Sequence, residues 1–210
     1  NWERLILEGG SAPASAGWSV AADEQVAVIG APDASLRGVS SGAAYVLERS
    51  GPTGRWNLQT RLVPPELSRY DRFGWSVDVA GETIVVGARY HDTPADNAGS
   101  VWVYDRLPDG VWRHAQTLES PQPRPGDEFG WSVSTNGSMI AVGAYLEDRA
   151  EPNMGAVYLY EKAGGPDGPG LLFSAKEASI RLTPGAGQHT SASAVGPALG
   201  ISADGIYDMA

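Results

Sequence analysis

The sequence contains no cysteine, so disulfide bonds and thiolate metal sites are excluded. No apolar run approaches the roughly 20 residues that a membrane-spanning helix needs, and no stretch has the spacing of a long amphipathic helix. Basic residues are also scarce: 15 Lys and Arg stand against 25 Asp and Glu, a net charge of −10. Because an acidic chain repels phosphate, we expect no nucleic-acid partner, and we expect no membrane span in this segment.

Glycine and proline are abundant instead, with 27 and 15 residues in a chain of 210. Apolar residues make up 42% of the chain, which is enough for an ordinary hydrophobic core. Many turn-forming residues without helical periodicity indicate short β-strands joined by turns. The sequence therefore predicts an all-β protein.

The tetrapeptide GWSV occurs three times, at 17–20, 74–77 and 130–133, and each copy precedes a short apolar run that ends in Gly-Ala. A third segment rich in aromatic residues and a more polar fourth segment follow in the same order. The landmarks recur after 57 and then 56 residues. Such a period is typical of a repeat architecture in which each unit is one supersecondary element.

Each unit reads as four short strands. The second strand, for example 84–86, is apolar on both faces, which predicts a strand covered on both sides. The fourth, for example 111–118, is the most polar and is predicted to be outermost. A repeated four-stranded antiparallel unit is the blade of a β-propeller; a β-solenoid or a row of small β domains is the alternative.

Crowding near the propeller axis explains why the same residues recur in every unit. We expect the Gly and Ser of GWSV to form a small flank against one neighbouring blade, while the Trp and Val fill the gap on the other flank. Asn136-Gly137 predicts a two-residue hairpin turn with positive φ at both residues.

About three and a half units are present. The predicted division of this single partial propeller is an outer strand of a preceding blade at 1–10, blades at 11–67, 68–123 and 124–184, and the start of a further blade at 185–210. A propeller closes with roughly four to eight blades. We therefore expect the chain to be part of a longer protein.

The motif, a GWSV copy followed by Gly-Ala after about ten residues, resembles the FG-GAP repeat of integrin α-subunit propellers. The matching residues are Phe73-Gly74, Phe129-Gly130, Gly30-Ala31-Pro32, Gly87-Ala88 and Gly143-Ala144. The resemblance implies a seven-bladed β-propeller, usually a binding module, and usually an extracellular, cell-surface or periplasmic location. No signal peptide is visible in the sequence.

Long segments join the second and third strands and connect successive blades, and in a four-stranded blade all of them reach the same face. Long loops on a rigid scaffold commonly carry binding residues, although these loops could also merely bridge the distance between strands. The candidate binding residues on this face are Asp33, Arg69, Tyr70, Tyr90, His91, Asp92, Tyr145 and Asp148.

Metal and cofactor signals are few. The resemblance implies a calcium loop between the first two strands, but tight turns replace that loop in the three full units. The final segment keeps D-G-x-x-D, so Asp204 and Asp208 are the candidate ligands for a calcium ion. No cofactor is predicted otherwise, and the three histidines stand in unlike contexts that do not suggest a metal triad.

No catalytic constellation emerges, and the predicted function is that of a non-catalytic module for adhesion-type protein binding. Its partner would be another protein or the rest of a longer chain of its own. One alternative is a carbohydrate-binding propeller, which predicts repeated aromatic pockets between blades. Another is a propeller-based polysaccharide lyase or dehydratase, which needs acidic and basic side chains converging at the channel.

Overall fold

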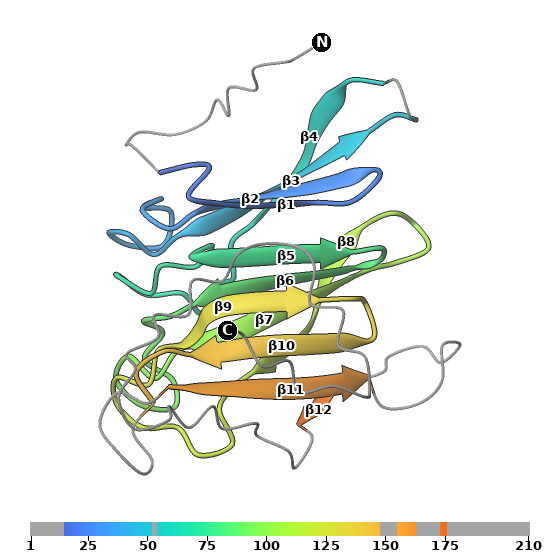
Figure 1. Ribbon diagram of the computed structural model, residues 1–210. Helices are drawn as coiled ribbons and strands as arrows, with labels where there is room; N and C mark the ends of the chain where they lie inside the picture. Colours follow the sequence, from blue (N-terminus) through green and yellow to red (C-terminus); the bar gives the residue numbers. More distant parts are fainter. Residues whose placement is uncertain (1–14, 52–53, 148–154, 163–172, 176–210) are drawn as a thin grey trace, which may run out of the picture.

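The computed structural model describes residues 15–51, 54–147, 155–162 and 173–175. Twelve β-strands form three antiparallel sheets of four strands each, and the described residues contain no helix. The sheets are stacked in chain order (Figure 1). The structure is therefore all-β, with three blades of a propeller, and it confirms the predicted fold class.

In each sheet the strands are arranged in sequence order. The first sheet contains β1 (Ser19–Ala22), β2 (Val26–Ala31), β3 (Ala43–Arg49) and β4 (Trp56–Leu62). The second contains β5 (Ser76–Ala80), β6 (Thr83–Ala88), β7 (Ser100–Arg106) and β8 (Trp112–Leu118). The third contains β9 (Phe129–Thr135), β10 (Met139–Ala144), β11 (Ala156–Lys162) and β12 (Phe173–Ala175).

These strands lie within the predicted units 11–67, 68–123 and 124–184. The predicted flanking pieces, 1–10 and 185–210, lie outside the described residues, and their assignment stays a prediction.

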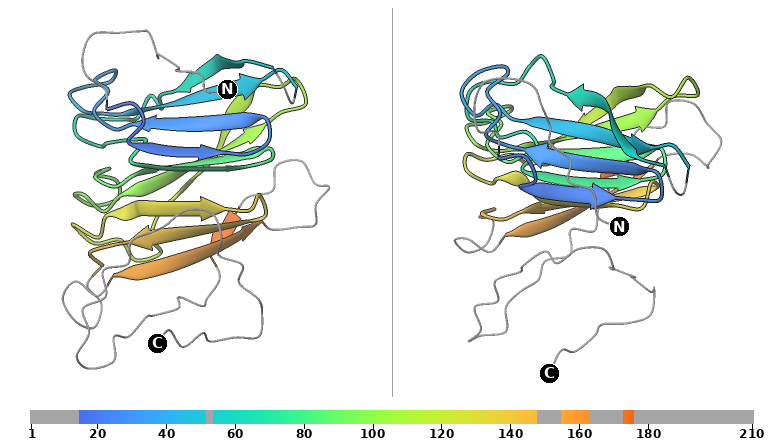
Figure 2. Two further views of the ribbon diagram at one scale, coloured as in Figure 1. Left: turned by 45° about the horizontal axis from the view of Figure 1, so that its top comes forward. Right: turned by 90° about the horizontal axis from the view of Figure 1, so that it is seen from above.

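The sheets converge toward their first strands. β1 lies against β5 and β5 against β9, and β2 and β6 contact the first strand of the following sheet. Within the described part of the chain, the fourth strands make no comparable contact with one another. Figure 2 shows the same stack from two further sides. Such convergence is expected of blades that surround an axis.

Small residues allow this close approach, as the sequence predicts. A Cβ added to Gly30 would lie 2.1 Å from the Gly74 carbonyl oxygen, and one added to Gly87 would lie 2.3 Å from the Gly130 carbonyl oxygen. The hydroxyls of Ser19 and Ser76 donate to those same two carbonyls, at 2.9 and 2.8 Å. One flank of each inner strand pair therefore has no room for a larger side chain.

The two larger core clusters fill the two spaces between the three sheets. Val28, Val46, Val77, Ile84 and Trp102 belong to the cluster between the first two sheets. A second cluster, which includes Val85, Val103, Phe129 and Ile140, lies between the second and third sheets. β6 is buried at every position because both of its faces are covered, which confirms the reading of 84–86. β4 and β8 each carry a run of three exposed positions and lie outermost in their sheets, as predicted.

The prediction for the tryptophan of GWSV holds only in part. Trp18 is 54% exposed, and Trp75 and Trp131 are half-buried, so these rings contact one another between adjacent blades but do not belong to the buried core between the sheets. In the third sheet, Ser132 pairs with Gly143 and Phe129 pairs with Ala144, which leaves 130–131 as a bulge. A bulge re-aims a side chain, so in this sheet Trp131 follows a different direction from Val133 of the same tetrapeptide.

The hairpin prediction at Asn136-Gly137 needs a similar correction. Of these two residues only Gly137 has a positive φ, of +88°. The Oδ1 atom of Asn136 instead accepts hydrogen bonds from backbone amides across the turn, so its side chain supports the turn in place of a left-handed backbone.

Candidate functional site

The two ends of the sheets carry different connections. Short turns join the first to the second strand of each sheet and β7 to β8, and they lie to the right in Figure 1. The long connections gather at the opposite end. We call that end the long-loop face; its described residues are 31–42, 64–73, 89–99, 119–129 and 144–147.

Neighbouring loops on this face are joined in pairs by backbone hydrogen bonds. The amides of Tyr70 and Phe73 donate to the carbonyls of Val39 and Ser41, at 2.8 and 3.0 Å. The same pattern recurs one blade later, where the amides of Gly126 and Phe129 donate to the carbonyls of Asp96 and Ala98, at 3.0 and 2.8 Å. The loop that leaves each blade is therefore tied to the preceding loop, so the face is held by the scaffold.

Four aromatic rings form a continuous row at the long-loop face. The ring centroids of Trp18 and Trp75 are 4.6 Å apart, those of Trp75 and Trp131 are 5.5 Å apart, and those of Trp131 and Tyr145 are 4.6 Å apart. We call these four residues the aromatic row. It crosses all three blades, and its two ends are open, since Trp18 is 54% exposed and Tyr145 is 53% exposed.

Arg89 holds the middle of the aromatic row. Its guanidinium carbon lies 3.6 Å from the ring centroid of Trp75, 4.0 Å from that of Tyr90 and 4.4 Å from that of Trp131. A guanidinium over an aromatic face is attracted by the ring quadrupole, and more strongly when water is excluded. Arg89 directly follows β6, so the end of this strand places it at the long-loop face.

Glu128 completes this cluster. Its Oε2 lies 2.9 Å from Nη1 of Arg89, and both side chains are largely buried. Burial raises the pKa of Glu128 above its usual value, although the charge and the hydrogen bond of Arg89 act in the opposite direction. Arg89 is therefore the group that offsets part of the cost of burying this carboxylate.

The corresponding interface between the first two blades carries a more exposed pair. Nη1 of Arg72 lies 2.5 Å from Oδ1 of Asp33, and the hydroxyl of Ser15 donates to the other carboxylate oxygen. Beside it, the guanidinium carbon of Arg69 lies 4.8 Å from the ring centroid of Tyr70. Tyr70 has a φ of +72° and an exposed ring, so this loop presents an aromatic side chain to solvent.

His91 and Asp92 have structural contacts in their loop. His91 is only 7% exposed; its Nδ1 lies 3.0 Å from the Ser100 hydroxyl, and its ring packs edge-on against Trp102. Burial lowers the pKa of His91, opposed by a backbone hydrogen bond and by nearby carboxylates. Asp92 is exposed, and its Oδ1 accepts a hydrogen bond from the Asn97 amide at 2.8 Å.

The structure thus brings two of the predicted residues, Tyr90 and Tyr145, to one aromatic cluster. Asp33, Arg69 and Tyr70 lie on the loops of the neighbouring interface, and Asp148 lies outside the described residues. The candidate metal ligands Asp204 and Asp208 also lie outside them. Among the described residues, no group of three or more His, Asp or Glu side chains is arranged to hold a metal ion.

Sequence reasoning missed Trp18, Trp75, Trp131 and Arg89. The sequence predicts packing between blades for these tryptophans, because their neighbours Gly, Ser and Val do have that role. A signal was present, since each of these tryptophans follows a glycine, and Gly17, Gly74 and Gly130 all have positive φ. A left-handed residue before a strand turns the next side chain away from the regular alternation.

The short-turn end offers a different kind of surface. A shallow depression of 380 Å³ lies between the first two blades there, and it is lined mainly by polar and charged residues: Asp23, Glu24, Gln25, Val26, Gly81, Glu82 and Arg106. It contains no aromatic side chain. Separately, none of the described residues forms a helix that is long and apolar enough to cross a membrane.

Comparison with known proteins supports the repeat. The FG-GAP repeat family matches residues 3–47, 56–104 and 112–160, which together cover more than half of the chain. A search of curated protein sequences found no match. Among solved structures, the crystal structure of the Saccharomyces cerevisiae Sqt1 is similar, with 15% sequence identity and a TM-score of 0.47. That alignment covers 76% of this chain and 34% of the other, so the chain spans about a third of that protein.

Proposed function

The chain belongs to the FG-GAP repeat family, and from this premise we propose that it is a non-catalytic module of a larger surface, secreted or periplasmic protein, and that its long-loop face binds another protein. FG-GAP propellers are generally non-catalytic and are often found in extracellular or adhesion proteins. The observation that carries the proposal is the aromatic row, which is built by three blades and is exposed at both of its ends.

The composition of this cluster favours a protein partner. Trp, Tyr and Arg are the residues that contribute most often to binding energy at protein interfaces, particularly when their own positions are already fixed. Arg89 and Glu128 fix the central rings, so little conformational freedom remains to be lost there on binding. Tyr70 and Arg69 extend the same face toward the first blade.

A carbohydrate-binding propeller has less support. That alternative needs aromatic pockets between blades, and the aromatic residues of the core between the first two blades are buried: Trp102 is 0% exposed and Trp112 is 7% exposed. The enzyme alternative needs acidic and basic groups that converge in an accessible channel. The buried pair on this face, Arg89 and Glu128, is engaged with itself and with the rings.

The proposal can be tested with a photo-crosslinking amino acid placed at Tyr145, in the full-length protein on its native cell surface or in its native secretion. We expect a protein adduct that is absent when the same amino acid replaces Leu58, an exposed residue on the outer strand β4. The adducted protein is then purified and its affinity measured. Trp18→Ala should weaken binding about tenfold or more, and Leu58→Ala should not change it.

Two outcomes would overturn the proposal. One is unchanged affinity in Trp18→Ala and Tyr145→Ala together, which would remove the aromatic row from the interface. The other is specific binding to a defined sugar on a glycan array that is lost in the same variants, which would make the site a carbohydrate-binding surface.

A further inference from the structure

The turn between β9 and β10 carries the sequence Thr135-Asn136-Gly137-Ser138 and lies at the short-turn end, away from the aromatic row. Asn136 and Ser138 are exposed to solvent. The hydrogen bonds of the Asn136 Oδ1 atom join it to residues 138 and 139 of the same turn. Neither the proposed binding function nor the core uses this side chain.

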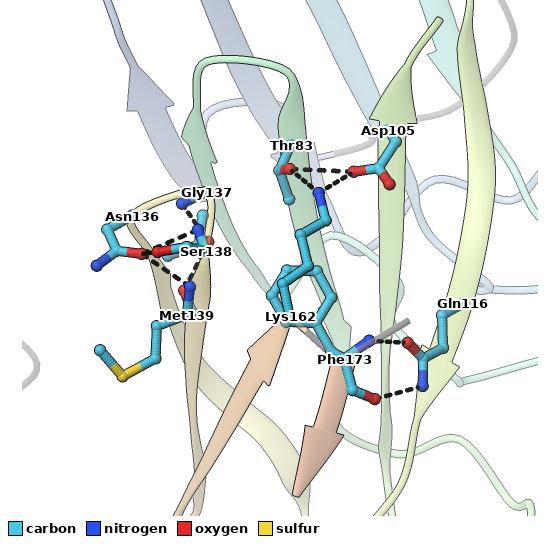
Figure 3. A network of polar contacts seen from close by, with 10 residues as sticks. Thr83, Asp105, Gln116, Asn136, Gly137, Ser138, Met139, Lys162 and Phe173 are labelled. Carbon is cyan, nitrogen blue, oxygen red and sulfur yellow. Dashed lines mark hydrogen bonds and ion pairs between the residues drawn. The ribbon is translucent and has the colours of Figure 1, made fainter. Parts of the chain in front are cut away.

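The carboxamide oxygen of Asn136 lies among three hydrogen-bond donors. The Ser138 amide and the Ser138 hydroxyl both donate to Oδ1 at 3.0 Å, and the Met139 amide donates at 2.8 Å (Figure 3). Fixed donors around a carbonyl oxygen stabilise the negative charge that the oxygen gains when its carbon is attacked. The turn therefore favours nucleophilic addition to the Asn136 Cγ atom.

A nucleophile is available one residue along the chain. The amide of Gly137 donates its N–H to the Thr135 hydroxyl oxygen at 3.0 Å, which polarises the bond that must lose its proton. Gly137 has no side chain to obstruct the approach of its nitrogen to Cγ. The Asn136 side chain is also directed over the following residues, since its oxygen bonds the amides of residues 138 and 139.

We propose that Asn136 is a site of spontaneous deamidation promoted by the folded turn. The Gly137 nitrogen forms a bond to Cγ and gives up its proton to water. Nδ2 takes a proton from water, and the bond from Cγ to Nδ2 breaks as ammonia leaves. The resulting cyclic imide takes up one water at either carbonyl. Hydrolysis yields aspartate or isoaspartate, with water consumed and ammonia released.

The first blade already contains the aspartate form of this turn. Oδ1 of Asp23 accepts hydrogen bonds from the amides of Gln25 and Val26 at 3.0 and 2.8 Å, the same two distances that Asn136 makes in the third blade. A carboxylate thus fits the position without loss of the turn. Isoaspartate would instead lengthen the backbone by one methylene and misalign β9 with β10.

The test follows deamidation in the intact chain, incubated folded in mildly alkaline buffer and mapped by peptide mass spectrometry for replacement of the amide NH2 by OH. We expect Asn136 to convert at least about tenfold faster than Asn57 and Asn97, which precede Leu58 and Ala98. Conversion at Asn136 no faster than at Asn97 would overturn the proposal.

A pair of variants tests the role of the turn itself. Ser138→Ala removes one donor to Oδ1 and should slow conversion about twofold or more, whereas Ser134→Ala, whose hydroxyl bonds Asp78, should not. The difference should vanish in urea, where the donors are not held in place. Equal rates for Ser138→Ala and the parent chain in the folded state would remove the donors from the explanation, as would a difference that persists in urea.

Discussion

The interface between the first and second blades and the interface between the second and third use the same backbone contacts but opposite charges at the long-loop face. In both, a serine hydroxyl donates to a glycine carbonyl of the next blade. At the first interface, however, the loop connecting the blades supplies the cation Arg72 to Asp33, whereas at the second it supplies the anion Glu128 to Arg89.

The position of the arginine within each ion pair determines which side chains its guanidinium contacts. Arg89 is placed among Trp75, Tyr90 and Trp131, while Arg72 faces no aromatic ring among the described residues. At the opposite end of the sheets the charges are not exchanged: Glu48 pairs with Arg106, and Asp105 pairs with Lys162. The repeat thus imposes the backbone contacts, and the side chains on the long-loop face differ between the two interfaces.

The largest effect is expected at the glycine contacts, which the two interfaces share. Gly30→Ala and Gly87→Ala should each lower the free energy of unfolding by about 3 kcal/mol, because the new Cβ meets a backbone carbonyl of the next blade. Gly143→Ala is the matched control. Its Cβ would meet only the Ser132 hydroxyl, at 2.5 Å, and that side chain can rotate away. Urea denaturation measures all three; equal losses in the three variants would contradict the shared blade contact.

The second-largest effect is expected at the ion pairs of the long-loop face, which differ between the two interfaces. Arg89→Met should cost about 2 kcal/mol, since it leaves Glu128 buried without its cation and removes the contacts with three rings. Arg72→Met should cost less than about 1 kcal/mol, because its pair with Asp33 is partly exposed. Double-mutant cycles with Glu128→Gln and Asp33→Asn isolate the two pairs. A coupling energy at the first interface as large as at the second would erase the distinction.

A smaller, pH-dependent effect is expected at the first interface. Asp71 is fully buried; its Oδ2 accepts a hydrogen bond from the Ser68 amide, and no donor among the described residues reaches its Oδ1. Burial raises the pKa of Asp71 to about 6, in spite of the Ser68 hydrogen bond. The protonated form is therefore favoured by folding, so its stabilising contribution is complete below the unfolded pKa of 3.8 and is lost as the pH rises through about 6.

Asp71→Asn keeps an acceptor for Ser68 and removes the charge. It should raise the free energy of unfolding by roughly 1–2 kcal/mol near pH 8 and leave it nearly unchanged at a pH below 4. Thermal unfolding at several pH values measures the difference. A variant that is less stable than the parent near pH 8 would show that the carboxylate has a stabilising partner.

The smallest effect is expected at the ion pairs of the short-turn end, where both interfaces have the acidic residue on the earlier blade and the basic residue on the later one. Lys162→Met removes the contacts of Nζ with Asp105 and Thr83 (Figure 3), and Arg106→Met removes the contact with Glu48. Each should change the free energy of unfolding by no more than about 0.5 kcal/mol, because these pairs are partly exposed to water. If either variant loses as much free energy of unfolding as Arg89→Met does, the ion pairs at the short-turn end stabilise the interfaces as strongly as the Arg89 cluster.

The sequence by itself determined the repeat, the four strands of each blade, their order and the small flank of Gly30 and Gly87. Those properties follow from local chemistry: a strand buried on both faces must be apolar throughout, as 84–86 is, and a backbone that is touched by its neighbour must be glycine.

Only the tertiary structure decided where the tryptophans of GWSV point, because their direction depends on the glycine φ angles and, in the third sheet, on the bulge opposite Gly143 and Ala144. It alone also brought Arg89 to Trp75, Trp131 and Glu128, which come from different blades. Contacts between residues far apart in the chain are set by how the sheets stack, and the sheets stack through the shared glycine and serine contacts, whichever charges the loops above them carry.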